Sequence, residues 1–552
     1  MKKNLIIAAI LFLSIGIAVL TRVYKLGEAP AGLYIDEAGQ GYSAYSILKT
    51  GKDEFGEAFP IVFRSFTDFK TPVYIYLLVP LIPIFGLSAF TVRFPSFFFS
   101  ILTIPLLYFL LKRISPKPIA VGISLLASFL LALSPWHILF GRTNFECNVA
   151  LFFFLAGVYF FYRGLDKPKN LILSVILFSI AIPSYHSQRI ITPLFSLLLF
   201  LRHRKKLLLS SHLKYLIAGL ILGFIILLPT ISVSLTPGFL ARASGLNIFS
   251  WHRQAPWGYI PNLSQIVDLI VNNPIVLSTK EFLSLYFSYL SPRSMFALGD
   301  YGPRSSFPEL STFFLWQLPF YIAGLYALVK RKFDELSFFT IALLIISPIP
   351  AAITRDPYST IRALPLVIPQ IIIVSLGIHA FWQFLQKRVY KILALAGFFL
   401  IIFYSLGKLY SSVIILNEYY RASEWDYGWR EVAQTISRLN PTLPVVVDTA
   451  RDEPYISLLF FLKFDPATYQ KDNVEVKLSE YYTDMNRLGV RKIGHIVTRP
   501  IDWKPDLKIK QYLVGDSLAI STQQIEVHGL TLIKEIYYPD GSPAFRIVQT
   551  NP

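Results

Sequence analysis

The sequence predicts a polytopic α-helical membrane protein with a small α/β domain at its carboxyl-terminal end. Three observations support this fold class. First, 54% of the 552 side chains are hydrophobic and only 16% are charged, a composition more apolar than that of ordinary soluble domains. Second, apolar stretches of about the length that crosses a bilayer recur as far as residue 412. Third, charged residues and short β-rich runs such as Pro444–Val447 follow Ser412.

The apolar stretches predict about eleven transmembrane helices, joined on the outer side by juxtamembrane helices. The first stretch begins after the basic residues Lys2 and Lys3 and ends at Leu20. No small-residue cleavage pattern follows it, so we expect a retained span and not a removed signal peptide. The remaining spans are predicted at residues 94–111, 119–136, 148–163, 170–184, 189–201, 213–229, 311–329, 336–352, 363–384 and 390–412.

Positive charge decides whether the short apolar segment Pro72–Gly86 crosses the membrane. Pro80 and Pro83 interrupt this segment. If it lies in the outer interface, the basic clusters between later spans all face the cytoplasm, as the positive-inside rule requires. These clusters are Lys112-Arg113, Arg163/Lys167/Lys169, Arg202/Arg204/Lys205/Lys206, Lys330-Arg331-Lys332 and Lys387-Arg388/Lys391. We therefore expect a protein of the cytoplasmic (inner) membrane with a cytoplasmic amino terminus and an extracytoplasmic carboxyl-terminal domain.

Two domains follow from this topology. Residues 1–412 form a transmembrane module with two large outer loops, 22–93 and 230–310, and residues 413–552 form the extracytoplasmic α/β domain. In that domain, Ile533–Ile547 reads as a β-hairpin. We assign the net charge of +18 to basic residues that anchor the chain at the cytoplasmic face of the membrane. The expected partners therefore include membrane lipids but no nucleic acid. The single cysteine, Cys147, excludes an intramolecular disulfide and argues against a cysteine metal cluster.

The acidic pair Asp36-Glu37 stands near the start of the first outer loop. Carboxylates beside a bilayer are costly unless they have a function or a partner. Tyr42, Tyr45 and Leu48 recur after the pair at helical spacing, which predicts a short helix on the membrane. In one interpretation Asp36 is merely the helix N-cap, and Glu37 favours the positive helix end. In the other, the pair is catalytic, and Tyr42 contacts the substrate.

Cations are normally scarce on the outer side of a membrane protein, yet several are predicted there. Four of them suit a phosphate group, which arginine binds with two parallel hydrogen bonds and lysine as a point charge: Lys70, Arg189, Arg304 and Arg362. Contact with lipid headgroups and snorkelling are the alternatives for each. Three further polar residues are candidates in these loops: Glu146, which could instead pair with Arg142, and the substrate-binding candidates His186 and Asp300.

The order of these motifs resembles the glycosyltransferase C superfamily. Within it the chain is most similar to family 39, which includes protein O-mannosyltransferases and lipid A aminoarabinose transferases. The resemblance covers roughly residues 1–412. It rests on Asp36-Glu37, Phe69-Lys70-Thr71-Pro72, Arg93-Phe94-Pro95, Ser134-Pro135 with Arg142 and Glu146, Leu298-Gly299-Asp300 with Arg304, and Arg362-Ala363-Leu364-Pro365.

Such enzymes transfer a sugar from a polyprenyl phosphate to an acceptor outside the cytoplasm, with inversion. The resemblance implies that Asp36 matches the catalytic acid, Lys70 the basic residue near the phosphate, and Glu146 the second acidic position. The residue chemistry agrees with this assignment, because a carboxylate can accept the proton of an acceptor hydroxyl and fixed cations stabilise a departing phosphate. Glu37 would then orient Asp36, or contact a metal or the acceptor.

Several questions stay open on the sequence. A divalent metal held by Asp36 and Glu146 would rest on only two oxygens, so no metal is assigned. The acceptor is a glycan, a lipid or a protein. The alternative function is a polytopic transporter or lipid flippase of the envelope, which paired halves and charges near the membrane midplane would favour. A third is a catalytically inactive scaffold, for which the loss of Asp36 would be harmless.

Overall fold

The structure is a computed structural model that describes residues 2–66, 68–240, 248, 264–449, 453–473, 477–483 and 489–552. The chain divides into two compact units. The first unit contains Met1–Tyr24, Ser96–Leu235 and Leu240–Ser412, and the second contains Lys25–Pro95, Thr236–Phe239 and Val413–Pro552.

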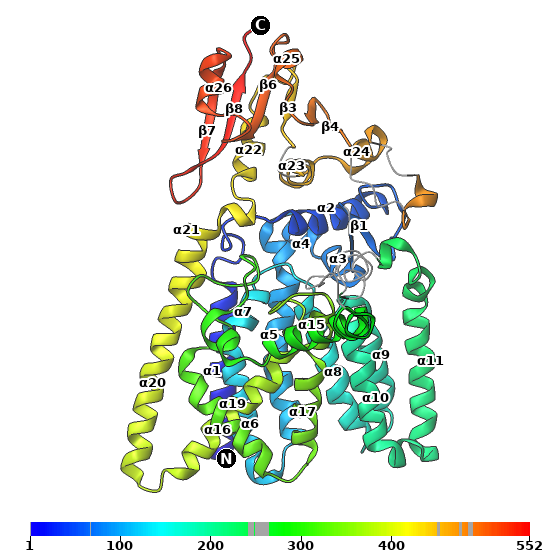
Figure 1. Cartoon of the computed structure of the whole chain (residues 1–552), viewed down its shortest axis with the longest axis vertical. Coiled ribbons are helices and arrows are strands. Elements are labelled where there is room, and N and C mark those ends of the chain that lie inside the picture. The colour runs from blue at the N-terminus through cyan, green and yellow to red at the C-terminus, as the bar shows by residue number, and fades with distance from the viewer. Residues whose placement is uncertain are drawn as a thin grey trace. The chain divides into compact units, whose positions relative to one another are not determined.

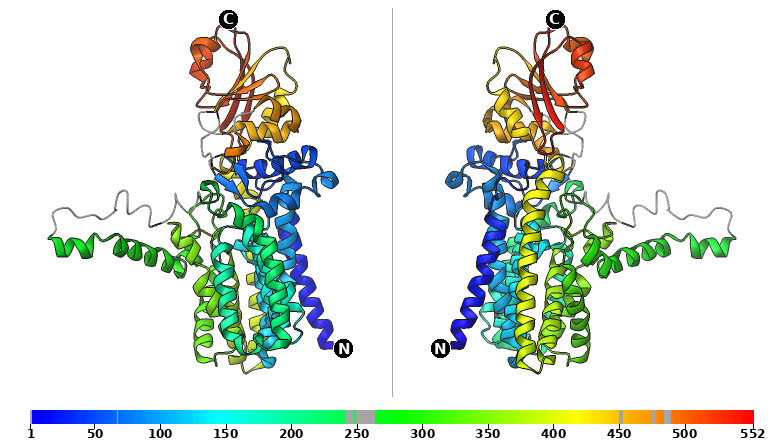
Figure 2. Two further views of the ribbon diagram at one scale, coloured as in Figure 1. Left: turned by 90° about the vertical axis from the view of Figure 1, so that its right-hand side faces the viewer. Right: turned by 90° about the vertical axis from the view of Figure 1, so that its left-hand side faces the viewer.

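Long apolar helices make up the first unit, and Figure 2 shows them running roughly side by side. Seven helices among the described residues are long and apolar enough to cross a membrane, and two shorter apolar helices accompany them. The helices and helical turns of this unit are α1 (Lys2–Val23), α5 (Ala89–Ile114, whose first residues belong to the second unit), α6 (Lys117–Leu133), α7 (Pro135–Phe140), α8 (Cys147–Gly164), α9 (Asn170–Ser184), α10 (Gln188–Leu207), α11 (Ser210–Val233), α14 (Gln265–Val271), α15 (Pro274–Ser288), η1 (Ser294–Leu298), η2 (Leu315–Gln317), α16 (Leu318–Lys330), α17 (Glu335–Ile346), α18 (Ile349–Ile353), η3 (Leu364–Leu366), α19 (Val367–Phe384) and α20 (Arg388–Tyr410).

Each stretch predicted to span the membrane coincides with helical structure in the first unit. The predicted span at 336–352 is divided, because α17 ends at Ile346 and Pro348 precedes α18. Small residues allow the closest helix contact of the bundle: a Cβ atom added at Gly324 of α16 would lie 1.8 Å from the carbonyl oxygen of Ile373 in α19. Such close approach of backbones is typical of membrane helices. How many of the helices cross a bilayer stays a prediction.

The first outer loop supplies the amino-terminal part of the second unit. It forms α2 (Ile35–Thr50), the antiparallel pair β1 (Phe63–Ser65) and β2 (Asp68–Lys70), α3 (Pro72–Leu78) and α4 (Ile82–Phe85). The predicted short helix after Asp36-Glu37 is confirmed as α2. Because α3 has seven residues and α4 has four, neither reaches the roughly 20 residues that a span needs. The segment Pro72–Gly86 thus contains no helix long enough to span a bilayer, and its place in the outer interface stays a prediction.

The carboxyl-terminal part of the second unit contains a six-stranded sheet with the strand order β4-β5-β3-β6-β8-β7 (Figure 1). Its core includes Val446, Leu513, Ile520, Leu530 and Val548. The predicted hairpin at Ile533–Ile547 is confirmed as β7 and β8. The elements are η4 (Ser411–Leu416, which begins in the first unit), α21 (Asn417–Arg421), η5 (Ser423–Trp425), α22 (Trp429–Ile436), β3 (Val445–Val447), α23 (Pro454–Leu462), α24 (Pro466–Asp472), η6 (Leu478–Glu480), β4 (Arg491–Ile493), β5 (Ile496–Thr498), α25 (Trp503–Asp506), β6 (Tyr512–Asp516), α26 (Thr522–Val527), β7 (Thr531–Tyr537) and β8 (Pro543–Gln549).

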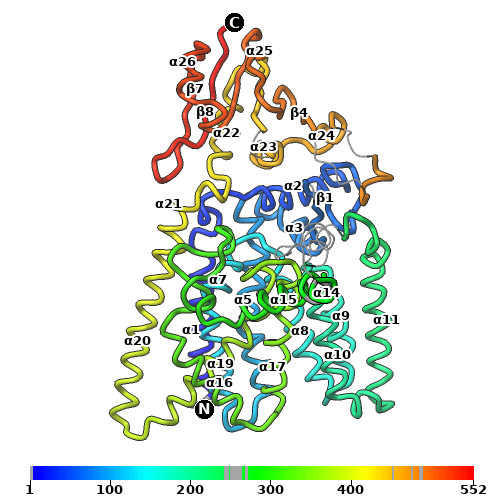
Figure 3. Tube along the Cα trace, in the orientation of Figure 1, coloured from blue at the N-terminus to red at the C-terminus, as the bar shows by residue number. Residues whose placement is uncertain are grey.

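The first outer loop groups with the carboxyl-terminal residues and not with the membrane helices, although the sequence predicts it inside the 1–412 module. In the second unit α2 packs against α23 and α24 (Figure 3). Gly41 permits this contact, since a Cβ atom there would lie 2.6 Å from the ring of Phe460. Part of the second predicted outer loop, residues 241–247 and 249–263, lies outside the described residues.

Candidate active site

Two carboxylates satisfy the first backbone amides of α2. Glu37 Oε2 accepts a hydrogen bond from the Tyr34 N–H at 3.3 Å, and Asp426 Oδ2 accepts one from the Ile35 N–H at 2.8 Å. These amides have no partner within the helix, so outside acceptors stabilise its start. Because the N-cap is Tyr34, the interpretation of Asp36 as the N-cap is wrong. Asp36 instead lies in the first turn of α2.

Asp36 forms an ion pair with Lys70. The Nζ of Lys70 lies 2.7 Å from Oδ2 of Asp36, and the two side chains are 9% and 20% exposed, respectively. Lys70 is the last residue of β2 and pairs in register with the buried Phe63 of β1, which fixes its backbone. An ammonium group has three N–H donors. Lys70 can therefore hold Asp36 and still donate to an oxygen of a ligand.

Glu37 has a different environment from its neighbour. Both its oxygens accept hydrogen bonds from Arg93, at 2.9 Å from Nε and 2.7 Å from Nη2. The side chains of the pair are at most 1% exposed. Arg93 also donates to the carbonyl oxygens of Leu26, Pro30 and Gly32. Thus the pair ties the loop before α2 to the start of α5, and the burial of Glu37 favours a positioning role over contact with an acceptor.

Tyr42 lies in the core of the second unit. It has no exposed surface, and its hydroxyl donates to the carbonyl oxygen of Phe464 at 3.0 Å. Its ring packs edge-on against Tyr469 of α24. This geometry makes Tyr42 a packing residue that holds α2 against the carboxyl-terminal helices, and it does not support the predicted contact with substrate.

A buried acidic pair that sequence reasoning missed, Asp53-Glu54, follows α2. Asp53 Oδ2 accepts a hydrogen bond from the Tyr481 hydroxyl at 2.6 Å, and Glu54 Oε2 accepts one from the Ser43 hydroxyl at 2.7 Å. Burial raises the pKa of Asp53 to about 7. Burial, together with the charge of Asp53, raises the pKa of Glu54 to about 8. The sequence offers no signal for this burial, since Tyr481 lies far along the chain.

The remaining candidates belong to the first unit. Glu146 immediately precedes α8 and is 7% exposed. The buried Arg142, four residues earlier, donates through Nη1 to the carbonyl oxygens of Thr21 and Arg22 at 3.0 and 3.1 Å. These bonds tie the segment before α8 to the end of α1. Glu146 thus lies in a polar, largely buried part of the bundle.

Arg189 and His186 lie at the tight turn between α9 and α10. Both are partly exposed, and the His186 ring packs edge-on against Tyr185 at 6.0 Å between centroids. Arg189 is the second residue of α10. The preceding helix, α9, ends one residue after Pro183. The turn therefore presents one cation and one imidazole between the adjoining ends of α9 and α10.

Asp300, Arg304 and Arg362 belong to two loops that the structure joins. Asp300 Oδ2 accepts hydrogen bonds from the backbone N–H and the hydroxyl of Thr360, at 2.7 and 2.8 Å. The Thr360 hydroxyl also contacts the carbonyl oxygen of Ser305. Arg362 forms an ion pair with Asp356. Burial raises the pKa of Asp300. These bonds give Asp300 a structural role in joining the loops, next to the two arginines.

Metal binding has limited support in this arrangement. Among the described residues, no three histidine, cysteine, aspartate or glutamate side chains form a group that could hold a metal ion. Asp36 and Glu146, the two carboxylates considered for a metal, belong to different units.

Comparisons with known proteins place this geometry in context. The family model described as dolichyl-phosphate-mannose-protein mannosyltransferase matches residues 69–232. No curated protein matches the chain. The crystal structure of ArnT from Cupriavidus metallidurans bound to undecaprenyl phosphate is similar over 100% of this chain and 99% of its own, with 12% identity and a TM-score of 0.50.

The chain has the fold of a glycosyltransferase C protein. The resemblance to this superfamily, and within it to family 39, is confirmed. Two other structures are also similar. The apo oligosaccharyltransferase of Archaeoglobus fulgidus shares 13% identity, with 98% of this chain and 74% of that one covered and a TM-score of 0.48. The mycobacterial arabinofuranosyltransferase AftD shares 12%, with 99% and 40% covered and a TM-score of 0.44. The apolar helices make the chain an integral membrane protein, as predicted.

Proposed function

We propose that the chain is a membrane glycosyltransferase that moves a sugar from a polyprenyl-phosphate donor to a hydroxyl group of an acceptor, outside the cytoplasm and with inversion. The observation that carries the proposal is the ion pair of Asp36 and Lys70, at 2.7 Å, in the first outer loop. The pair places the partly exposed carboxylate of Asp36 beside the cation of Lys70, in a chain with the glycosyltransferase C fold. ArnT, which shares the fold, has been crystallised with undecaprenyl phosphate.

Asp36 is the proposed general base. As the acceptor oxygen attacks the anomeric carbon, it must lose its proton, and a carboxylate within hydrogen-bond reach can take it. Asp36 is suited to this task because its side chain is 20% exposed, whereas that of Glu37 is 1% exposed. Glu37 is the proposed positioning residue: its bond to the Tyr34 N–H and its pair with Arg93 fix the first turn of α2.

Lys70 is the proposed contact to the donor phosphate. Negative charge grows on the phosphate oxygen as the sugar departs, and a fixed cation stabilises that charge most in the transition state. Arg189, Arg304 and Arg362 are further proposed phosphate contacts, with Glu146 as a second acid and with His186 and Asp300 near the substrate. We also propose that the chain lies in the inner membrane, and the position of its basic clusters favours an amino terminus in the cytoplasm and a second unit outside.

A donor panel tests the proposal. The full chain in lipid nanodiscs is incubated with polyprenyl-phosphate hexoses and pentoses and with glycan, lipid and protein acceptors, and loss of donor is followed by mass spectrometry. We expect acceptor-dependent consumption of at least one donor and a product heavier by one sugar. In proteoliposomes, movement of intact donor across the bilayer without consumption would contradict the proposal and favour a flippase.

A further inference from the structure

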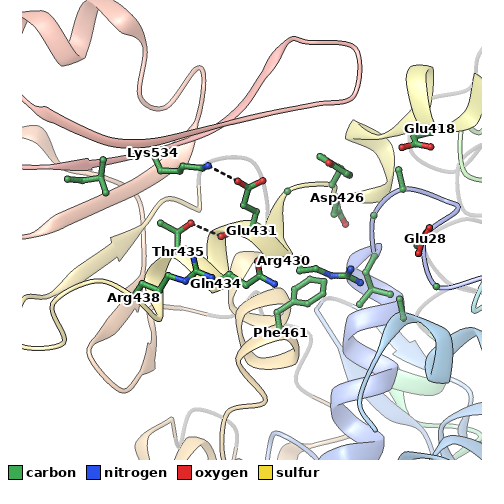
Figure 4. Close-up of a pocket in the computed structure, with 18 residues that line it drawn as sticks. Glu28, Glu418, Asp426, Arg430, Glu431, Gln434, Thr435, Arg438, Phe461 and Lys534 are labelled. Atoms are coloured by element: carbon green, nitrogen blue, oxygen red, sulfur yellow. Dashed lines mark hydrogen bonds and ion pairs between the residues drawn. The ribbon is translucent and has the colours of Figure 1, made fainter. Parts of the chain in front are cut away.

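A pocket of about 570 Å³ lies within the second unit (Figure 4), and Gly32 and Asp426, two residues already described, are part of its lining. This volume is within the range of about 300–1,000 Å³ that small-molecule sites occupy. Its walls come from the loop Gly27–Leu33, the segment Asp426–Gly428, α22, Phe461 of α23, and Ile533 and Lys534 of β7.

The polar face of α22 forms one wall. Trp429, Val432 and Ile436 are at most 3% exposed and pack into the core, so the opposite face of the helix must be polar. On that face Arg430 and Gln434 line the pocket, and Arg438, two residues beyond the end of α22, extends the same wall. A helix face that contacts only solvent would not be enclosed by other segments of the chain. Here the loop before α2 and strand β7 enclose it, which makes a concave site.

Charge is distributed unevenly along the pocket. Figure 4 shows the carboxylates of Glu28, Glu418 and Asp426 toward one end, on the side to which the Arg430 guanidinium reaches, and the cationic side chains of Arg438 and Lys534 toward the other, where Glu431 pairs with Lys534. A small ligand that meets both ends would therefore need groups of both signs. A simple polyanion or polycation would meet like charge at one end.

The ion pair in the pocket does not block it. Lys534 Nζ lies 3.0 Å from Glu431 Oε1, and the side chains are 45% and 44% exposed. Exposed pairs of this kind contribute little to stability, so a ligand can replace the partner of either group. Phe461 adds an apolar wall, with the Arg430 guanidinium 5.9 Å from its ring centroid. An aromatic ring beside fixed polar groups suits the C–H face and hydroxyls of a sugar.

We propose that this pocket binds a saccharide that carries both an amino group and an anionic group, and that it is the acceptor subsite of the transferase. The second clause rests on the proposed function. Asp426 links the pocket to the chemistry: it lines the acidic end, and its Oδ2 accepts the hydrogen bond from the Ile35 N–H at 2.8 Å. Asp426 thus connects the wall of the pocket to the first residue of the helix that carries Asp36.

Saturation-transfer NMR on the full chain in nanodiscs tests the binding directly, without donor or turnover. Four probes separate the two charges: glucosamine 6-phosphate, glucosamine, glucose 6-phosphate and glucose. We expect the strongest binding for glucosamine 6-phosphate. Arg438→Gln should weaken binding of the two phosphorylated probes about tenfold, and Glu418→Gln should weaken binding of the two amino sugars about tenfold, as expected for loss of a charge-assisted bond.

Controls and outcomes keep the site separate from the transfer reaction. Lys510→Gln and Glu526→Gln remove exposed charges of the same unit outside the pocket, and both should leave binding unchanged. Because binding is measured without donor or turnover, failure of the proposed chemistry would not mimic failure of the pocket. Equal signals from all four probes, no signal from any, or signals unchanged in both pocket variants would overturn the proposal.

Discussion

Substitution of Glu37 by glutamine should loosen the first turn of α2 more than it changes the chemistry. Glu37 is fully buried, and its two oxygens face Nε and Nη2 of Arg93 at 2.9 and 2.7 Å. Glutamine keeps the shape of the side chain, but its NH₂ group must face a donor of Arg93. Removing one partner of a buried ion pair costs about 3–5 kcal/mol. Because Arg93 keeps bonds to three carbonyl oxygens, we expect a cost of about 3 kcal/mol.

Hydrogen exchange followed by mass spectrometry measures this cost locally. Where exchange follows the population of the open state, lowering the free energy of opening α2 by about 3 kcal/mol makes the amides of Ile35–Thr50 exchange roughly 100-fold faster. Asp36→Asn is the matched control, since its side chain is partly exposed, and it should change exchange far less. If Glu37→Gln abolished sugar transfer while exchange of α2 stayed at the wild-type rate, the positioning role would be refuted and Glu37 would be catalytic.

Three further predictions concern the same unit. Lys70→Ala should lower kcat/KM for the donor by about ten- to a hundredfold, since a charged hydrogen bond contributes about 1.5–3 kcal/mol and this one strengthens as charge grows on the phosphate; unchanged donor kinetics would exclude Lys70 from the phosphate site. Asp426→Ala should speed exchange at the start of α2 by about tenfold, because the Ile35 N–H loses its acceptor; wild-type exchange would show that another group satisfies this amide. The raised pKa values of Asp53, about 7, and Glu54, about 8, mean that the folded state binds protons that the unfolded state releases above about pH 4. Stability should therefore fall as pH rises from about 5 to 8, and Asp53→Asn should reduce this dependence in thermal unfolding; an identical pH profile in the variant would contradict the assignment.

Much of the fold is visible in the sequence because bilayer crossing depends on local properties. Length and hydropathy locate the apolar helical stretches of the first unit, though not α14 and α15 in the second outer loop, and the proline-interrupted segment Pro72–Gly86 forms only two short helices. The hairpin β7–β8 is also local, with Gly541 at positive φ in its turn. These elements need no information from distant residues.

The grouping of the first outer loop with the carboxyl-terminal residues could not be predicted, since it depends on contacts between distant segments. Asp426 accepts the hydrogen bond of Ile35, and Tyr481 donates to Asp53. Nothing in the local pattern of either segment identifies these partners. The pocket beside α22 has the same origin, because its walls come from both ends of the chain.

Only part of the candidate site could be predicted, because contacts between distant segments also decide which face of a helix is buried. Asp36 and Lys70 were singled out from an outer loop rich in unexpected charge, and the structure brings them together. Adjacent residues in a helix point in different directions, so Asp36 and Glu37 have different exposure even though the sequence treats them as a pair. Tyr42 shows the same limit: helical spacing identifies the element but does not say which of its faces packs against the carboxyl-terminal helices.

The most direct test of the central claim is the transfer rate of Asp36→Asn, measured together with binding of the donor. Asparagine keeps the size of the side chain but cannot accept the proton of the acceptor hydroxyl. We expect transfer to fall by about 10²–10⁴-fold, with donor binding retained because Lys70 still holds the phosphate. Asp540→Asn, in the exposed turn of the β7–β8 hairpin, is the matched control and should transfer at the wild-type rate. Near-normal turnover of Asp36→Asn would contradict the assignment of Asp36 as the base.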